Sequence, residues 1–189
     1  DKKTMVLFLL YIKAELEGVG SLSLKRGTNI CISVRNPLSD YEVREKVAFN
    51  LDEVIEQDEG DAIPKHHFAL KWDGSQKRSY LQVLSMEETK TALKKSNKKK
   101  KGGGGGGGIV KSSYETDDSG DWVPILAMEC RGLEPYAFHG LGDEFVVESE
   151  GGIRFDEDVD LSEGDWAEYD EENDAAVSIS DVETKFEPA

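Results

Sequence analysis

Short runs of apolar and β-branched residues, separated by polar turns, dominate this chain. The runs that stand out are Leu7–Leu16, Asn29–Val34, Phe68–Trp72, Tyr80–Leu84, Trp122–Cys130, Glu144–Glu148, Ala176–Ile179 and a last one that reaches Phe186. Gly, Asp, Ser and Pro recur between them at short intervals, which is typical of antiparallel strands and unlike the longer helical spacers of βαβ units. The pattern therefore predicts an all-β fold of antiparallel strands.

Two segments, Leu51–Gln57 and Glu87–Lys95, have a weaker helical pattern. Neither keeps an apolar stripe for long, so the sequence gives little support for a helix in either. The first apolar run, Met5–Ile12, is eight residues long, well short of the roughly 20 that a membrane helix needs. Lys13 and Glu15 follow it without a small-residue cleavage site, so we expect a buried strand and neither a signal peptide nor a membrane segment.

A lysine- and glycine-rich tract interrupts the strands. It consists of Lys94–Lys101 followed by Gly102–Gly108 and offers nothing apolar to bury. A phosphate-binding loop would need Lys and Ser or Thr directly after its last glycine, whereas Ile109 and Val110 follow here. We therefore predict a flexible insertion over residues 94–120.

Three segments recur in the same order on either side of this insertion. The pairs are Ala14–Ser21 with Met128–Pro135, Val47–Asp61 with Ile153–Asp165, and Val83–Lys90 with Ile179–Lys185. Ordered self-similarity of this kind predicts that one β unit is built twice by internal duplication. The halves, residues 5–93 and 121–189, would each have a marginal core alone, so we expect two antiparallel β halves packed as one compact unit.

Charge and cysteine content narrow the class of protein. The chain has 189 residues, and 39 acidic residues against 23 basic ones give it a formal net charge of -16. Nucleic-acid binding needs clustered Lys and Arg, so protein partners or basic peptides suit this chain better than nucleic acid. Cys31 and Cys130 are too few for a disulfide framework, which favours a reducing, cytoplasmic location. We expect a monomer.

Three sequence blocks in the C-terminal part resemble a known family. They are Glu129-Cys-Arg-Gly-Leu-Glu-Pro135, Glu148-Ser-Glu-Gly-Gly-Ile-Arg-Phe155 and Asp165-Trp-Ala-Glu-Tyr-Asp170. Together they resemble the C-terminal half of the eukaryotic CXXC-motif-containing zinc-binding proteins, a family of unknown function. The resemblance is specific from Trp122 to Phe186. It implies an all-β fold with internal pseudo-symmetry, and it hints at contacts with metal-handling proteins.

In that family, two Cys-x-x-Cys pairs in the N-terminal half hold one zinc ion, and this chain departs from the pattern at all four cysteines. The matching tetrads are Asn36-Pro-Leu-Ser39 and Trp72-Asp-Gly-Ser75, so the ligand positions hold Asn36, Ser39, Trp72 and Ser75. A structural zinc site needs four nitrogen or sulfur ligands, and none of these residues offers a thiolate. We therefore predict a degenerate zinc site without zinc or another cofactor, in which packing and hydrogen bonds replace the metal.

Two functions of different classes remain open. The first is a non-enzymatic protein-interaction scaffold or adaptor whose partner surface includes Asp143–Asp174, where fifteen residues are acidic and only Arg154 is basic. The second is a metal-binding or metal-transfer protein with a displaced site at His66, His67 and Cys31, although neighbouring histidines on a strand point to opposite faces. Neither a serine elbow nor a nucleophile beside a histidine is visible, so we do not expect an enzyme.

Overall fold

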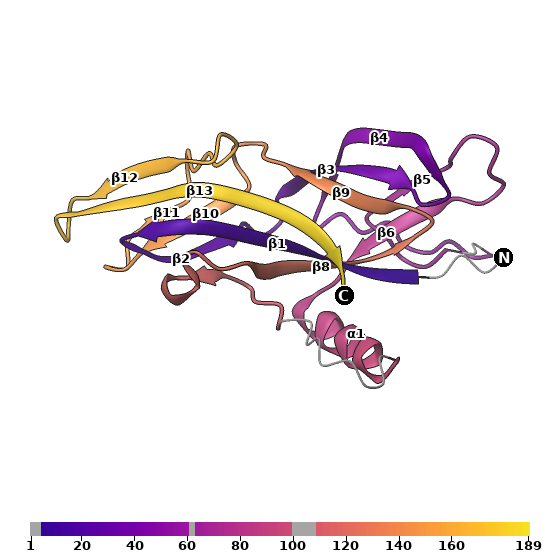
Figure 1. Cartoon of the computed structure of the whole chain (residues 1–189), viewed down its shortest axis with the longest axis horizontal. Helices are drawn as coiled ribbons and strands as arrows, with labels where there is room; N and C mark the ends of the chain where they lie inside the picture. Colours follow the sequence, from indigo (N-terminus) through magenta and orange to yellow (C-terminus); the bar gives the residue numbers. More distant parts are fainter. Residues whose placement is uncertain (1–4, 61–62, 100–108) are drawn as a thin grey trace.

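Three antiparallel sheets form the protein in a computed structural model that describes residues 5–60, 63–99 and 109–189 (Figure 1). The sheets have the strand orders β12-β13-β1-β8-β6-β5, β11-β10-β2-β7 and β4-β3-β9. The strands are β1 (Met5–Glu17), β2 (Val19–Leu24), β3 (Asn29–Asn36), β4 (Ser39–Asn50), β5 (Phe68–Leu70), β6 (Ser79–Val83), β7 (Tyr114–Glu115), β8 (Val123–Arg131), β9 (Glu134–His139), β10 (Phe145–Ser149), β11 (Arg154–Phe155), β12 (Trp166–Asp170) and β13 (Ala175–Pro188). The prediction of an all-β, antiparallel fold is confirmed.

Strand β1 lies in the middle of the large sheet, and its position explains its apolar sequence. It pairs with β8 along one edge and with β13 along the other. Leu10 and Ile12 face the main core, whereas Leu9 packs with Leu84 and Val110 on the opposite face. A strand that is covered on both faces is apolar at nearly every position. The prediction of a buried first strand is confirmed.

The two halves interlock, which differs from the expectation that two β units meet only at their apolar faces. Each sheet contains strands of both halves, because β1 pairs with β13, β2 with β10, β3 with β9, and β6 with β8. The cores are mixed in the same way, since Leu22 of the first half and Val147 of the second belong to one buried cluster. Pairing across the halves satisfies the backbone groups along the long strands β1 and β13, which run most of the length of the molecule (Figure 1).

The strand pairing is nevertheless symmetric. When strands β1 to β6 are exchanged in order for β8 to β13, every pairing among these twelve strands becomes an observed pairing, and the central pair β1–β8 maps onto itself. Strand β7 and helix α1 (Met86–Lys99) have no counterpart, and both lie between β6 and β8 in the sequence. This symmetry agrees with the internal duplication, which itself stays a prediction from the sequence.

Helix α1 is longer and more regular than the sequence pattern suggested. It begins with a capping box, in which the Glu88 amide donates to Ser85 Oγ at 3.1 Å and the Ser85 amide donates to Glu88 Oε1 at 3.0 Å. The other weakly helical segment, Leu51–Gln57, is not helical. Within the described ranges, no helix is long and apolar enough to cross a membrane.

Both ends of residues 94–120, the segment predicted as a flexible insertion, contain ordered structure. Its first residues, up to Lys99, belong to α1. Near its other end Tyr114 is fully buried, and its hydroxyl accepts a hydrogen bond from the Ala14 amide at 3.2 Å and lies 2.8 Å from the Asp121 carbonyl oxygen. The low-complexity composition ends at Ile109, where apolar residues can again join the core. Residues 100–108, with the glycine run, lie outside the described residues.

Replacing Tyr114 with Phe tests whether this segment is an integral part of the fold. Tyr114→Phe removes the hydroxyl and leaves the buried Ala14 amide without that acceptor, so we expect a loss of about 1–3 kcal/mol in the free energy of unfolding. Urea denaturation measures it. The matched control is Tyr41→Phe, because Tyr41 is 96% exposed and its change should stay within about 0.5 kcal/mol. Equal effects of the two substitutions would contradict the buried role of Tyr114.

Candidate functional site

The two tetrads predicted to stand at the positions of the cysteine pairs lie together, joined by Glu42 of β4. The Asn36 side-chain amide donates to Glu42 Oε1 at 3.0 Å, and the backbone amide of Asp73 donates to Glu42 Oε2 at 2.9 Å. One carboxylate thus connects the turn between β3 and β4 with the loop that follows β5. The Glu42 carboxylate thus joins two chain segments, as a shared metal ion would.

Trp72 anchors the second tetrad in the core. Its side chain is 2% exposed, and its indole Nε1 donates to the Gly132 carbonyl at 2.7 Å. Gly132 makes the turn between β8 and β9, inside the block that carries the family resemblance. On the other side, the Arg44 guanidinium lies 5.4 Å from the centroid of the Trp72 ring, a cation–π contact. The indole therefore links the degenerate site to the C-terminal half of the protein.

The remaining positions of the tetrads have local partners. Asn36 Oδ1 accepts from the Leu38 amide at 3.0 Å, and Ser39 is opposite Asn36 in the hairpin. Ser75 donates from its hydroxyl to the Lys77 carbonyl at 3.0 Å. Zinc needs thiolate, imidazole or carboxylate ligands around one point. An amide, two hydroxyls and a buried indole do not fit the ion.

The displaced site at His66, His67 and Cys31 is not assembled either. The Val83 amide donates to His67 Nδ1 at 3.0 Å, so Nε2 carries the proton and donates to the Leu51 carbonyl at 3.0 Å. Burial lowers the pKa of His67, which keeps this ring neutral and fully engaged. Across residues 5–60, 63–99 and 109–189, no three His, Cys, Asp or Glu side chains form a group that could hold a metal ion.

Acidic side chains line two adjoining hollows at the other end of the molecule. The larger has a volume of about 590 Å³, and its charged lining comprises five carboxylates and one lysine. These are Glu15, Glu163, Asp165, Asp181, Glu183 and Lys13. The smaller hollow has a volume of about 250 Å³ and shares Glu163, Gly164 and Val182 with the larger one. We call the two hollows together the acidic groove.

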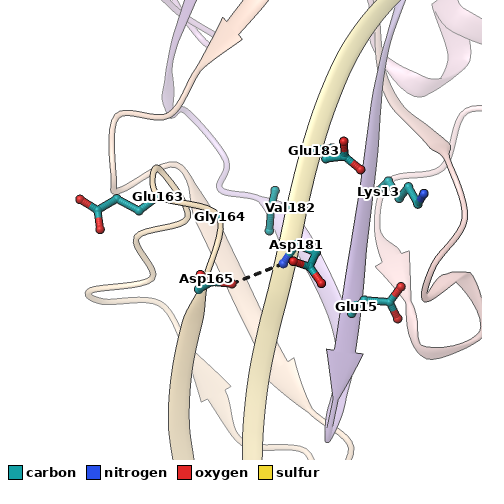
Figure 2. A pocket seen from close by; sticks show the side chains of 8 residues that line it. All are labelled: Lys13, Glu15, Glu163, Gly164, Asp165, Asp181, Val182 and Glu183. Carbon is teal, nitrogen blue, oxygen red and sulfur yellow. Dashed lines mark hydrogen bonds between the residues drawn. The ribbon is translucent and has the colours of Figure 1, made fainter.

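Strand pairing assembles this groove from distant parts of the sequence. Of the five carboxylates of the larger hollow, only Glu163 and Asp165 come from the acidic segment Asp143–Asp174, and the others come from β1 and β13. Figure 2 shows Asp165 and Asp181 close together, with the Asp181 backbone amide donating to Asp165 Oδ1 at 3.4 Å, while Glu163 points away from them. The β1 and β13 contributions cannot be read from the sequence, because only the pairing register of these strands places Glu183 opposite Lys13.

Removing the Glu42 carboxylate should weaken the link between the tetrads. Glu42→Ala leaves the Asn36 side chain and the Asp73 amide without their acceptor, and we expect a loss of about 1–2 kcal/mol in the free energy of unfolding, measured with urea. Glu45→Ala is the control, since Glu45 lies on the same strand and is exposed. If both variants lose the same stability, the Glu42 bridge is not a structural link.

Chelation should leave the stability of the protein unchanged. A bound structural zinc ion contributes on the order of 10 kcal/mol to folding, so its removal would lower the melting temperature by many degrees. We expect the same melting temperature, within about 1 °C, in EDTA and in excess zinc, because protein groups occupy the degenerate site. Stoichiometric zinc in the purified protein, with a fall in melting temperature in EDTA, would contradict this.

Comparison with known proteins extends the resemblance over the whole fold. The eukaryotic family described as CXXC motif containing zinc binding protein matches residues 9–187. UPF0587 protein CG4646 of Drosophila melanogaster is 45% identical over 73 residues, which are 39% of this chain and 44% of that protein. The human CXXC motif containing zinc binding protein is 36% identical over 73 residues, 39% of this chain and 45% of that protein. The chain thus matches less than half the length of these relatives.

Two solved structures share the fold. A hypothetical protein from Plasmodium falciparum superposes with a TM-score of 0.75 and 24% identity, covering 96% of this chain and 99% of that one. A crystal structure of C1orf123 gives a TM-score of 0.74 and 21% identity, covering 97% and 99%. Because the family match extends from β1 to β13 and takes in both interlocked halves, the chain belongs to the eukaryotic family of CXXC motif containing zinc binding proteins, although it contains neither Cys-x-x-Cys pair.

Proposed function

We propose that this chain is a non-enzymatic scaffold that binds basic protein partners through the acidic groove. The observation that carries the proposal is that five acidic residues from three separate chain segments line one hollow, with a single lysine among them. Carboxylates gathered in a concave surface produce a stronger negative potential than the same charges spread over a flat one. Such a surface attracts Lys- and Arg-rich partners and speeds their association.

The groove is held in place by backbone hydrogen bonds, which favours recognition. The Gly164 amide donates to the Leu161 carbonyl at 3.0 Å, and the Val182 amide donates to the Gly164 carbonyl at 3.1 Å. The loop before β12 is therefore tied both to itself and to β13. A preorganised surface loses little conformational entropy when a partner binds, so more of the contact energy is available for affinity.

The degenerate zinc site supports a scaffold role for a different reason. Glu42 and Trp72 connect the tetrads with protein groups alone, so the fold that presents the groove does not depend on the metal supply. The surroundings of Cys130 also indicate a packing role in the core and not a role as a reactive thiol. Cys130 is 1% exposed, and burial raises the pKa of its thiol far above the ordinary value, which keeps the thiol protonated.

Affinity capture with charge-neutralised baits tests the proposal. One bait carries Glu163→Gln, Asp165→Asn, Asp181→Asn and Glu183→Gln in the groove. A control bait loses the same number of charges at exposed positions near β4, through Glu45→Gln, Glu53→Gln, Glu56→Gln and Asp58→Asn. We expect the wild type and the control to retain the same basic proteins in a salt-sensitive manner, and the groove variant to lose them.

The outcome that counts against the proposal is an unchanged set of partners on the groove variant, provided that its melting temperature equals that of the wild type. Loss of partners by both variants to the same degree would show that net charge, and not this surface, governs binding.

A further inference from the structure

Helix α1 and the large sheet enclose a hollow that is separate from the acidic groove. Leu93 of α1 packs against the cluster of Leu9 and Leu84 on the outer face of the sheet, which fixes the helix there. Beside this contact lies a hollow with a volume of about 410 Å³, and none of its lining residues also lines the groove. We call it the helix hollow.

The floor of the helix hollow is a polar cross-strand pair. Gln82 of β6 and Glu129 of β8 are opposite each other in the antiparallel register, and both line the hollow. Gln82 is 8% exposed, and its side-chain amide donates one long hydrogen bond, 3.4 Å, to Glu88 Oε2. Glu129 is partly buried, and within the described residues its carboxylate has neither a hydrogen bond nor an ion pair.

The unused oxygens of this pair are accessible from the hollow. Three unpartnered side-chain atoms in the described ranges are sealed from solvent, namely His66 Nε2, Ser79 Oγ and Glu144 Oε1. Neither Gln82 Oε1 nor the Glu129 carboxylate is among them, although no described residue donates a hydrogen bond to either. Because a largely buried acceptor without a donor costs free energy, a donor that enters the hollow binds favourably there.

The charges in the lining favour a cation. Helix α1 contributes Glu87, Glu88 and Lys95 to the lining. Glu88 already pairs with Lys65 at 3.6 Å, whereas among the described residues Glu87 and Glu129 form no ion pair. Two unpaired carboxylates against one lysine give the hollow an excess of negative charge. A metal ion fits poorly, since no three His, Cys, Asp or Glu side chains of the described residues form a group that could hold one.

The size and shape of the hollow define the ligand further. Its volume of about 410 Å³ falls within the roughly 300–1,000 Å³ of typical small-molecule sites. The helical part of its lining runs from Glu87 to Lys95, about 12 Å along α1, so the hollow is elongated. Leu84 and Ala92 supply apolar lining, which suits a chain of methylene groups.

We propose that the helix hollow binds a linear diamine, with one ammonium group donating to Glu129 and Gln82 Oε1 and the other beside Glu87. An ammonium group has three rotatable donors, so a single one can serve both oxygens of the floor. This site is independent of the proposed binding of basic protein partners at the acidic groove.

The electrostatics of Glu129 agree with a missing counter-ion. Burial raises the pKa of the Glu129 carboxyl, the charge of Glu88 raises it further, and the charge of Lys95 lowers it. An ammonium group in the hollow would offset the two unfavourable effects and stabilise the carboxylate.

Calorimetric titration of the full chain with putrescine at low salt tests the inference. We expect one binding site, and we expect Glu129→Gln to raise the dissociation constant about fivefold or more, because the substitution keeps the shape and removes the charge. The matched control is Glu168→Gln, which removes the same charge from an exposed position on β12, far from α1 (Figure 1). It should raise the dissociation constant less than about twofold.

A second variant fills the hollow and keeps every charge. Thr91 is exposed on α1 and lines the hollow, and Thr91→Met puts a longer side chain there with a residue that favours helices. It should weaken putrescine as strongly as Glu129→Gln does, at an unchanged melting temperature. The wild type should bind butylamine, which has one ammonium group, more weakly than putrescine.

Several results would overturn the inference. The diamine site is wrong if the wild type does not bind putrescine, if Glu129→Gln and Glu168→Gln weaken binding equally, or if magnesium ions displace putrescine at equal concentration. It is also wrong if the groove variant with four neutralised charges loses putrescine binding, since the ligand would then lie in the acidic groove. None of these results decides the capture experiment, so the two proposals can fail separately.

Discussion

The position of β1 in the middle of the large sheet is the constraint on which the rest of the structure depends. Its hydrogen bonds to β8 and β13 connect the two ends of the chain, and its two faces are buried in different clusters. Because β8 and β13 belong to the second half, neither half can complete its part of the large sheet without the other. The same pairing brings the carboxylates of β1 and β13 beside the loop before β12, so the acidic groove exists only in the assembled fold. The same strand pairing therefore creates both the fold and the candidate binding surface.

This interlocking also bears on the predicted loss of the family's zinc site. A structural zinc ion supplies on the order of 10 kcal/mol, whereas each hydrogen bond that Glu42 and Trp72 provide contributes about 1 kcal/mol on average. These hydrogen bonds alone therefore connect the chain segments less strongly than a zinc ion would. However, Trp72 is buried in the same cluster as Met128 and Leu133, so the second tetrad is also held by packing against the other half. The second tetrad, Trp72-Asp-Gly-Ser75, is therefore continuous with the hydrophobic core through Trp72.

Two short segments with nearly the same sequence show where local pattern stops being informative. Glu87-Glu-Thr-Lys90 lies in α1, and Val182-Glu-Thr-Lys185 lies in β13. Ser85 caps the first segment and begins a helix, whereas the second is opposite Tyr11 to Lys13 of β1 and continues a strand. Pro135 is a similar case. Proline is typical of turns, yet Pro135 lies within β9, where the edge position of that strand tolerates a missing amide donor.

The sequence by itself determined the all-β class, the buried first strand, the family and the lack of any Cys-x-x-Cys pair, because each depends on composition or on spacing along one strand or turn. It also placed β3, β5, β6, β8 and β10 near their observed bounds. Only the tertiary structure decided which strands pair across the halves, that Glu42 connects the two tetrads, and that Glu144 is buried with a free oxygen. These features depend on contacts between residues far apart in the chain, and the pairing register that creates them leaves no periodic signal in either partner.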